Sequence, residues 1–441
     1  MSELSVTPAK RFRGRSFLGT LLVVALMLLA VAWPALRDDP APAPIGSATG
    51  AASFRGGPER TGSMPGPGPV SRVRLLWRVP TGQIRYASPV VGGDLVYVAA
   101  GGRAFAIGRL SGRIVWRVET DDDLATPVVA GDLVILGGQD VSALEGATGR
   151  ERWSFAAAGG VWSAAAVVDG VVYVASTGVI EGGGEDEGAR LHALAAGDGE
   201  PIWETPFGGY RSSAPTVVDG VVYVHADDGN LYAFDAATGQ ERWRQAIGAY
   251  ETLPGGAAVA EGTLFVVGRA PVAKEEGDGE TTAVLLALEA ATGQERWRFA
   301  VRGEGLILGP SPAVAAGAVF VSGGDRLYAL DAATGQERWR LLTDGNAGDP
   351  TVAGGVVFLT TGSGGAVLAA DARTGAELWR IQTIEVFPTN PVVVDGVVYL
   401  ACYNFDAEDG FVYAIGGSID PPETASPAAT PDLAFPTAHL R

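Results

Sequence analysis

The chain has 441 residues and a formal net charge of -18 at pH 7. Nucleic-acid binding needs a basic surface, so this acidic composition argues against a nucleic-acid partner. Cys402 is the single cysteine, which excludes an intrachain disulfide and any zinc site built on several cysteines. The histidines His192, His225 and His439 show no ligand spacing, so we expect no metal site built on His or Cys.

The first 36 residues predict export. Residues 1–16 form a basic cytoplasmic segment, and the apolar run at residues 17–36 is long enough to cross a bilayer as one helix. Basic residues before such a helix keep that end in the cytoplasm and place the remaining chain outside. A second reading stays open, because Ala30-Val31-Ala32 offers a signal-cleavage site that would release a secreted protein.

Residues 37–52 are rich in Pro and Ala and predict an extended linker between the membrane helix and the folded body. Phe54-Arg55-Gly56 and Arg60-Thr61-Gly62 follow the linker, and the first expected strand, Val73 to Val79, contains Trp77. At the other end, residues 418–441 are Pro-rich and predict a disordered tail.

One ten-residue motif repeats through the body of the chain. Asp-Ala-Ala-Thr-Gly-Gln-Glu-Arg-Trp-Arg occupies residues 331–340, recurs at 235–244, and recurs with Glu for Asp at 289–298. The Asp carboxylate can accept hydrogen bonds from the turn backbone, and Gly335 can adopt the left-handed conformation that reverses the chain. Each copy therefore predicts an antiparallel hairpin whose returning strand carries the Trp.

The spacing of these hairpins predicts the fold. Two-residue hairpin signals such as Asp169-Gly170, Asp219-Gly220 and Asp395-Gly396 join further strand pairs. Successive motif tryptophans lie roughly 40 residues apart, the length of a four-stranded propeller blade. We expect these tryptophans to be structural repeat positions: Trp77, Trp116, Trp153, Trp203, Trp243, Trp297, Trp339 and Trp379.

Seven complete units follow from this count, and an eighth stops short of its Trp strand. The strands Pro391 to Val394, Val397 to Cys402 and Phe411 to Ile415 belong to that last unit, and Val73 to Val79 can supply its missing strand. Such pairing closes the ring and removes its open edge. We predict an all-β chain, an eight-bladed β-propeller over residues 53–417 that is closed by the N-terminal strand and preceded by one transmembrane helix.

The pattern Ala-x-Asp-x-x-Thr-Gly-x-x-x-Trp, at residues 233–243 and 329–339, resembles the repeat of pyrroloquinoline quinone (PQQ)-type propellers. The segment from Phe54 to Gly62 resembles the one that often precedes their first blade. The resemblance implies that the Trp, Gly and Thr of each repeat lock neighbouring blades together. That family includes quinoprotein dehydrogenases as well as non-catalytic propellers, among them the outer-membrane assembly lipoprotein.

Candidate binding residues gather on the face formed by two kinds of loop, those joining second to third strands and those joining a fourth strand to the next blade. We call this the loop face. Aromatic side chains near the axis predict a funnel that stacks a flat ligand or an exposed strand of another protein. The funnel residues are Tyr86, Trp162, Tyr210, Arg211, Tyr250, Asn346, Phe387 and Asn390.

Most unpaired acids are also expected on the loop face, Asp344 and Asp349 among them. Asp406, Glu408 and Asp409 form a possible cation site, although their spacing matches no established calcium loop. The alternative for these acids is a set of solvated loops, and no protein-based metal site is otherwise predicted.

The expected function is a non-catalytic interaction scaffold, anchored in the cell membrane with its propeller outside the cytoplasm. Its expected partners are other extracytoplasmic or membrane proteins, and no cofactor is expected. One alternative is a quinoprotein dehydrogenase that uses PQQ and calcium to oxidise alcohols or sugars. The resemblance implies a disulfide between adjacent cysteines in the alcohol-oxidising members, and Cys402 alone cannot form one. A second alternative is a propeller that binds polysaccharide or cell wall.

Overall fold

The computed structural model describes eleven ranges of the chain, all within the compact unit Ile45–Arg441. No helix among these residues is long and apolar enough to cross a membrane. The predicted membrane segment, residues 17–36, lies outside them, as do segments 1–16 and 37–52 and the tail beyond Ser418. The described ranges are 54–84, 87–120, 124–178, 188–248, 255–270, 282–301, 309, 311–362, 365–383, 387–404 and 409–418.

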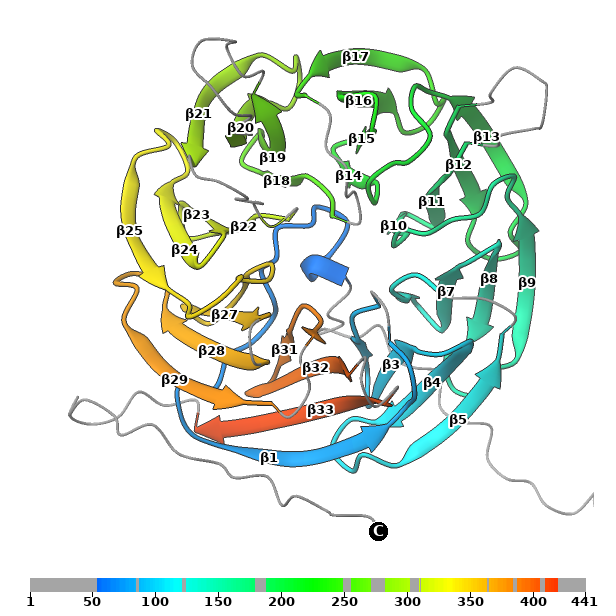
Figure 1. Ribbon diagram of the computed structural model, residues 1–441. Coiled ribbons are helices and arrows are strands. Elements are labelled where there is room, and N and C mark those ends of the chain that lie inside the picture. Colours follow the sequence, from blue (N-terminus) through cyan, green and yellow to red (C-terminus); the bar gives the residue numbers. More distant parts are fainter. Residues whose placement is uncertain are drawn as a thin grey trace, which may run out of the picture. The chain divides into compact units, whose positions relative to one another are not determined.

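The described residues form eight antiparallel sheets, as predicted, together with one short 3₁₀ helix, η2 (Phe54–Gly56). Figure 1 shows the sheets arranged as blades around η2. The innermost strands of successive blades contact one another in a closed circle, so the propeller is a complete ring.

Blades 1 to 4 each have four strands in chain order. They are β2 (Val90–Gly92), β3 (Leu95–Ala99), β4 (Arg103–Gly108) and β5 (Ile114–Glu119); β6 (Val128–Ala130), β7 (Leu133–Gly137), β8 (Asp140–Glu145) and β9 (Glu151–Ala156); β10 (Ala166–Val168), β11 (Val171–Ser176), β12 (Arg190–Ala195) and β13 (Pro201–Pro206); and β14 (Thr216–Val218), β15 (Val221–His225), β16 (Asn230–Asp235) and β17 (Glu241–Ala246).

Blades 5 to 7 repeat this order, and blade 8 combines both ends of the propeller. They are β18 (Ala258–Ala260), β19 (Thr263–Ala270), β20 (Thr282–Glu289) and β21 (Glu295–Val301); β22 (Ala313–Ala315), β23 (Ala318–Gly323), β24 (Arg326–Asp331) and β25 (Glu337–Leu342); β26 (Thr351–Ala353), β27 (Val356–Thr361), β28 (Ala366–Asp371) and β29 (Glu377–Gln382); and β30 (Phe387–Pro388), β31 (Val392–Val394), β32 (Val397–Asn404), β33 (Asp409–Ser418) and β1 (Ser71–Pro80).

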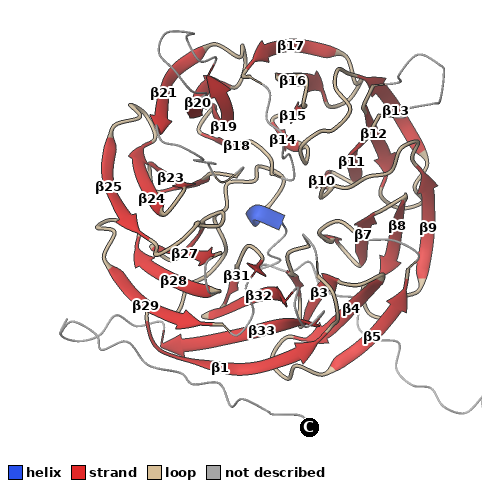
Figure 2. Cartoon of the chain, viewed as in Figure 1, coloured by secondary structure: helices blue, strands red, loops and turns tan. Residues whose placement is uncertain are grey.

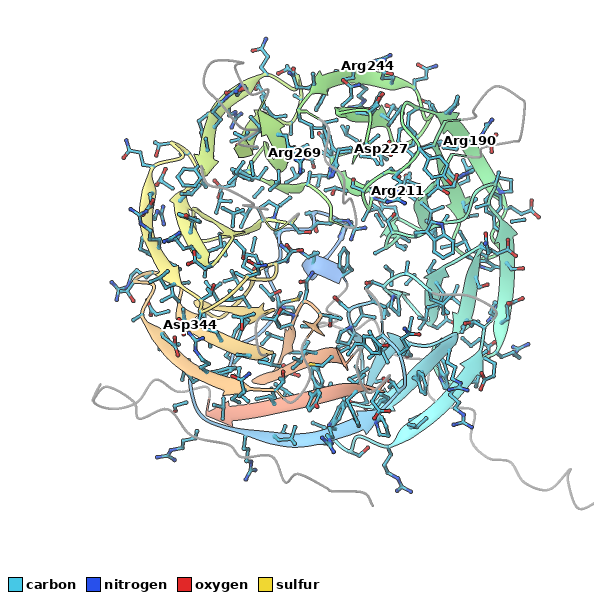
Figure 3. All side chains as sticks on the ribbon, viewed as in Figure 1. Arg190, Arg211, Asp227, Arg244, Arg269 and Asp344 are labelled. Atoms are coloured by element: carbon cyan, nitrogen blue, oxygen red, sulfur yellow. The ribbon has the colours of Figure 1, made fainter. Side chains whose placement is uncertain are left out.

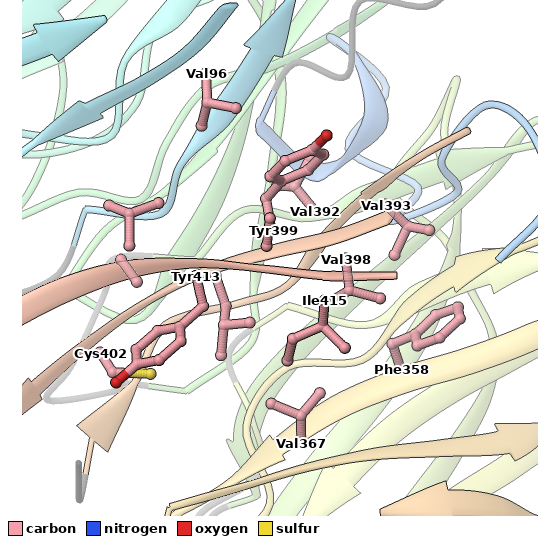
Figure 4. Packing of buried hydrophobic residues seen from close by; sticks show 14 of the residues in the cluster. Val96, Phe358, Val367, Val392, Val393, Val398, Tyr399, Cys402, Tyr413 and Ile415 are labelled. Carbon is pink, nitrogen blue, oxygen red and sulfur yellow. The ribbon is translucent and has the colours of Figure 1, made fainter. Parts of the chain in front are cut away.

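The predicted closure by the N-terminal strand is confirmed. Strand β1 pairs antiparallel with β33, placing Trp77 opposite Ala414 and Leu75 opposite Ile415. Side chains of blades 1, 7 and 8 form one continuous buried cluster across this junction, and Figure 4 shows Val96, Phe358 and Tyr399 within it. Burial of this apolar surface holds the ring shut.

The repeated turn has the predicted local structure. Asp331 Oδ1 accepts hydrogen bonds from the backbone N–H groups of Ala333 and Thr334, and Gly335 has a φ of 72°. Hydrogen bonds from the side chains of Arg338 and Thr334 lower the pKa of Asp331 to about 2. The carboxylate therefore stays ionised, and the turn keeps its shape over the ordinary pH range.

Each repeat Trp packs against the turn of the next blade. Trp297 Nε1 donates to the Ala332 carbonyl at 3.0 Å, and a Cβ on Gly335 would lie 2.6 Å from the Trp297 ring. The Thr contact is different, because Thr334 Oγ1 donates to Asp331 within its own turn. Trp and Gly therefore join neighbouring blades, whereas Thr stabilises its own. The same Trp–Gly approach joins Trp77 to Gly112, Trp116 to Gly149, Trp153 to Gly199, Trp203 to Gly239, Trp243 to Gly293 and Trp339 to Gly375.

Two glycines in different turns, Gly220 between β14 and β15 and Gly335 between β24 and β25, separate the backbone constraint from the packing constraint. Gly220 has a φ of 70° with nothing within 4 Å of an added Cβ, whereas Gly335 has a similar φ and faces Trp297. We expect Gly220→Ala to cost about 1–2 kcal/mol of unfolding free energy through backbone strain alone. Gly335→Ala should cost a further ~1–3 kcal/mol because of overpacking. Urea unfolding of both variants measures the difference, and equal losses would contradict the packing role.

Candidate functional site

The segment from Phe54 to Met64, which we call the channel segment, lies inside the ring of innermost strands, and Figure 2 shows η2 at its centre. Its carbonyl groups accept hydrogen bonds from the exposed edges of those strands. Val217 N–H donates to Pro58 O at 2.9 Å, and Val352 N–H donates to Gly62 O at 2.8 Å. The segment thus satisfies backbone donors that face the channel. Val259 and Val314 donate in the same way to Glu59 and Thr61.

Two buried guanidinium groups fix this segment to the blades. Arg60 donates to the carbonyls of Ala164 and Ala165 at 2.9 Å each, and its guanidinium lies 4.9 Å from the centroid of the Phe54 ring. Burial, with the nearby charge of Arg55, lowers the pKa of Arg60 to about 9. Arg60 therefore remains charged at neutral pH.

Arg55 holds the other side of the ring. It donates to Pro350 O at 2.7 Å and to Ser311 O at 2.9 Å, at the start of blades 7 and 6. Two arginines of one short segment thus tie together blades on opposite sides of the channel. The sequence predicted the segment by resemblance, but it did not predict that the segment lines the channel.

Replacing Arg60 tests this role. We expect Arg60→Met to lower the unfolding free energy by at least about 3 kcal/mol, because hydrogen bonds from a charged group are worth about 1.5–3 kcal/mol each. Arg74→Met is the control, since Arg74 is exposed on β1. Urea unfolding measures both variants, and losses of similar size would show that Arg60 does not secure the segment.

On the loop face the structure brings two predicted aromatics onto adjacent loops. Trp162 is 43% exposed on the loop between β9 and β10, and Tyr210 is 42% exposed on the loop between β13 and β14. Both loops are bonded to the loop after β11, since Thr177 N–H donates to Gly160 O and Gly178 N–H donates to Tyr210 O. Two large aromatic surfaces thus stand on a backbone supported by hydrogen bonds.

Asp227 fixes the backbone beneath Tyr210. Its Oδ1 accepts from the Tyr210 N–H at 2.7 Å, and its Oδ2 accepts from the Arg211 N–H at 3.1 Å. Figure 3 labels Arg211 and Asp227 together near blade 4. Because the carboxylate engages backbone groups, both side chains of this dipeptide remain exposed.

The predicted asparagines belong to other blades. Asn390 Nδ2 donates to Asp349 Oδ2 at 3.2 Å, between the loops that lead into blades 7 and 8. Asn346 is exposed on the loop before β26. The described part of the predicted funnel therefore divides into a group with Trp162 and Tyr210 and a group with the asparagines. Of the remaining predicted residues, Tyr86, Tyr250 and the side chain of Phe387 lie outside the described structure.

The expectation of unpaired acids is wrong for Asp344 and Asp349. Asp344 forms an ion pair with Arg380 at 3.3 Å, and Figure 3 labels it beside blade 7. Asp349 is buried, and burial raises its pKa while the charge of Arg55 opposes that shift. Sequence spacing could not reveal Arg380 as the partner of Asp344 or Arg55 as the neighbour of Asp349, because each pair joins residues far apart in the chain.

The predicted cation site stays a prediction. Asp406 and Glu408 lie outside the described residues, and Asp409 is exposed at the start of β33. Within the ranges that the structure describes, no group of three or more His, Cys, Asp or Glu residues is placed to hold a metal ion.

His225 is a buried titratable group near this surface. Its backbone N–H donates to Ser213 Oγ at 3.2 Å, three residues beyond Tyr210. Burial lowers the pKa of His225 from 6.5 to about 4. Between these values the unfolded chain binds a proton that the folded protein does not, so stability falls as the pH falls.

We expect this group to contribute about 3 kcal/mol to the loss of stability between pH 6.5 and pH 4, at roughly 1.4 kcal/mol for each pKa unit. His225→Gln should flatten that part of the pH dependence. Urea unfolding of the wild type and the variant across this range measures the effect. An unchanged slope would show that His225 ionises normally in the folded protein.

Comparison with known proteins places this propeller in a family. Residues 72–157, 137–286, 228–307 and 280–415 match the PQQ-repeat family described as outer membrane protein assembly factor BamB, so that the matches together run from residue 72 to residue 415. The chain belongs to this BamB family. The family match covers every blade described above.

Two solved structures show how widely the fold of this BamB-family chain is shared. BamB from Moraxella catarrhalis is 18% identical with a TM-score of 0.60, over 80% of this chain and 100% of that one. The quinohemoprotein alcohol dehydrogenase ADHIIG from Pseudomonas putida HK5 is 14% identical with a TM-score of 0.62, over 89% and 85%. At these identities the likeness shows the fold alone.

One curated protein also resembles this BamB-family chain. The serine/threonine-protein kinase AfsK of Streptomyces coelicolor is 29% identical over 246 residues, which are 55% of this chain and 26% of the kinase. The chain thus spans about a quarter of the kinase's length.

Proposed function

We propose that this protein is a non-catalytic interaction scaffold of the BamB family. Residues 17–36 anchor it in the cell membrane, and its propeller lies outside the cytoplasm. The propeller binds another extracytoplasmic or membrane protein on the part of the loop face that carries Trp162 and Tyr210.

The exposure of these two aromatics is the observation that carries the proposal. Large aromatic side chains supply much of the binding energy where proteins meet, and they lose little conformational entropy on binding. The hydrogen bonds of Gly160, Gly178 and Asp227 hold their loops in place before any partner arrives. A prearranged surface of this kind favours tight binding without chemistry.

The buried carboxylate that the structure describes beside the channel does not fit a calcium–quinone pair. Asp349, a buried carboxylate there, accepts hydrogen bonds from Ser311 N–H at 3.3 Å and from Asn390 Nδ2 at 3.2 Å. Its charge also faces the guanidinium of Arg55. With both oxygens engaged and a protein cation nearby, Asp349 is a poor calcium ligand. We derive no catalytic step through such a cofactor.

Site-specific photo-crosslinking in cells tests the scaffold. A photoreactive residue at position 162 should give a defined protein adduct, whereas the same group at Leu342 should not. Leu342 is a matched control because it is 56% exposed on the outer strand of blade 6. Tyr210→Ala should weaken the adduct at position 162, since both side chains contribute to one surface.

Equal adducts at positions 162 and 342 would contradict a specific surface. The enzyme alternative has its own assay, in which the purified protein is mixed with PQQ and calcium and tested for dye reduction with alcohols and sugars. Turnover would overturn the non-catalytic proposal.

A further inference from the structure

The face opposite the loop face carries a groove between blades 3 and 4. We call this face the turn face, because it is formed by the turns that join first to second and third to fourth strands. The groove has a volume of about 550 Å³, within the range of ligand sites in proteins. It extends from Glu59 in the channel segment to Ile202 on β13, and the two blades lie side by side in Figure 1.

One repeat position shapes the wall of this groove. The residue before each Trp is the extra residue of a β-bulge, as Arg242 is between Glu241 and Trp243. In four blades this residue is an arginine that pairs with the acid at the end of the third strand. The pairs are Arg152 with Glu145, Arg242 with Asp235, Arg296 with Glu289 and Arg338 with Asp331, with N–O distances of 3.2, 2.6, 3.7 and 2.9 Å.

Blade 3 lacks both members of this pair. Its bulge residue is Ile202, and Ala195 stands where those four blades have the acid. Ile202 is 51% exposed and lines the groove beside Val168 and Val218. An apolar wall thus replaces a guanidinium at this point of the ring.

The groove holds four acids and one arginine, Arg242. Glu59, Asp169 and Asp219 line it and are exposed, and no ion pair to any of them occurs among the described residues. The fourth acid, Asp235, is already bonded to Arg242. The groove therefore combines an apolar wall with three carboxylates that form no ion pair within the described structure.

We propose that this groove binds a protein segment carrying an arginine or lysine between apolar residues. The stem of such a side chain packs on Ile202 and the valines, and its charged end reaches the carboxylates of Asp169 and Asp219. The partner's cation thereby adds a second positive charge to that of Arg242, on the side of the groove where Ile202 stands in place of an arginine. This surface lies on the face opposite Trp162 and Tyr210, so it does not depend on the proposed function.

A labelled peptide with one arginine between leucines tests the groove, and its twin carries neutral citrulline in place of arginine. Fluorescence anisotropy with the full-length protein at low salt should show the arginine peptide binding at least about tenfold more tightly, a difference of ~1.4 kcal/mol. Ile202→Arg should abolish this preference, because the new side chain occupies the groove. Val115→Arg is the control, being the same bulge position in blade 1.

A second variant keeps the test valid if the Ile202→Arg protein fails to fold. Asp169 and Asp219 both have a φ of 49°, a conformation that Asn tolerates, so Asp169→Asn with Asp219→Asn should fold and lose most of the preference for arginine. Equal binding of the two peptides to the wild type would overturn the proposal, as would equal losses in the Ile202 and Val115 variants. Trp162→Ala with Tyr210→Ala should leave peptide binding unchanged, which separates this surface from the loop face.

Discussion

The pairing of β1 with β33 is the contact on which the rest of the propeller depends. A ring of sheets leaves two open edges unless its ends meet, and open edges invite association with other chains. Here the chain's first strand supplies the outermost strand of its last blade, and Trp77 packs on Gly112 of blade 1. The closing blade thus has the same junction with its neighbour as the internal blades have, which makes the ring uniform.

That uniformity leaves the loops free to differ. The Trp–Gly junction uses side-chain packing and one carbonyl group, as between Trp297 and the turn of blade 6, so it places few demands on the ends of the strands. The loop face and the turn face can therefore acquire separate binding roles on one scaffold. The fold by itself does not determine which of these roles is present, since BamB and a quinohemoprotein dehydrogenase share it.

The channel segment links the ring to its functional surfaces. Arg55 and Arg60 bind this segment to the blades, so that the chain's own backbone occupies the space near the axis. Glu59 of the same segment borders the groove of blades 3 and 4. A substitution in this segment would affect both the stability of the propeller and binding in the groove. We regard it as a structural element of the propeller rather than as a linker before it.

The sequence by itself determined the strands, their order and the ring, because hairpin turns and Trp spacing are local features that recur at a fixed period. It also singled out Trp162 and Tyr210 as aromatics that the repeat does not use. Only the tertiary structure decided that Asp349 is buried beside Arg55, that Asp344 pairs with Arg380, and that Ile202 lines a groove with Asp169 and Asp219. These are contacts between residues of different blades or distant segments, and a repeat that specifies each blade alike carries no information about which of them will meet.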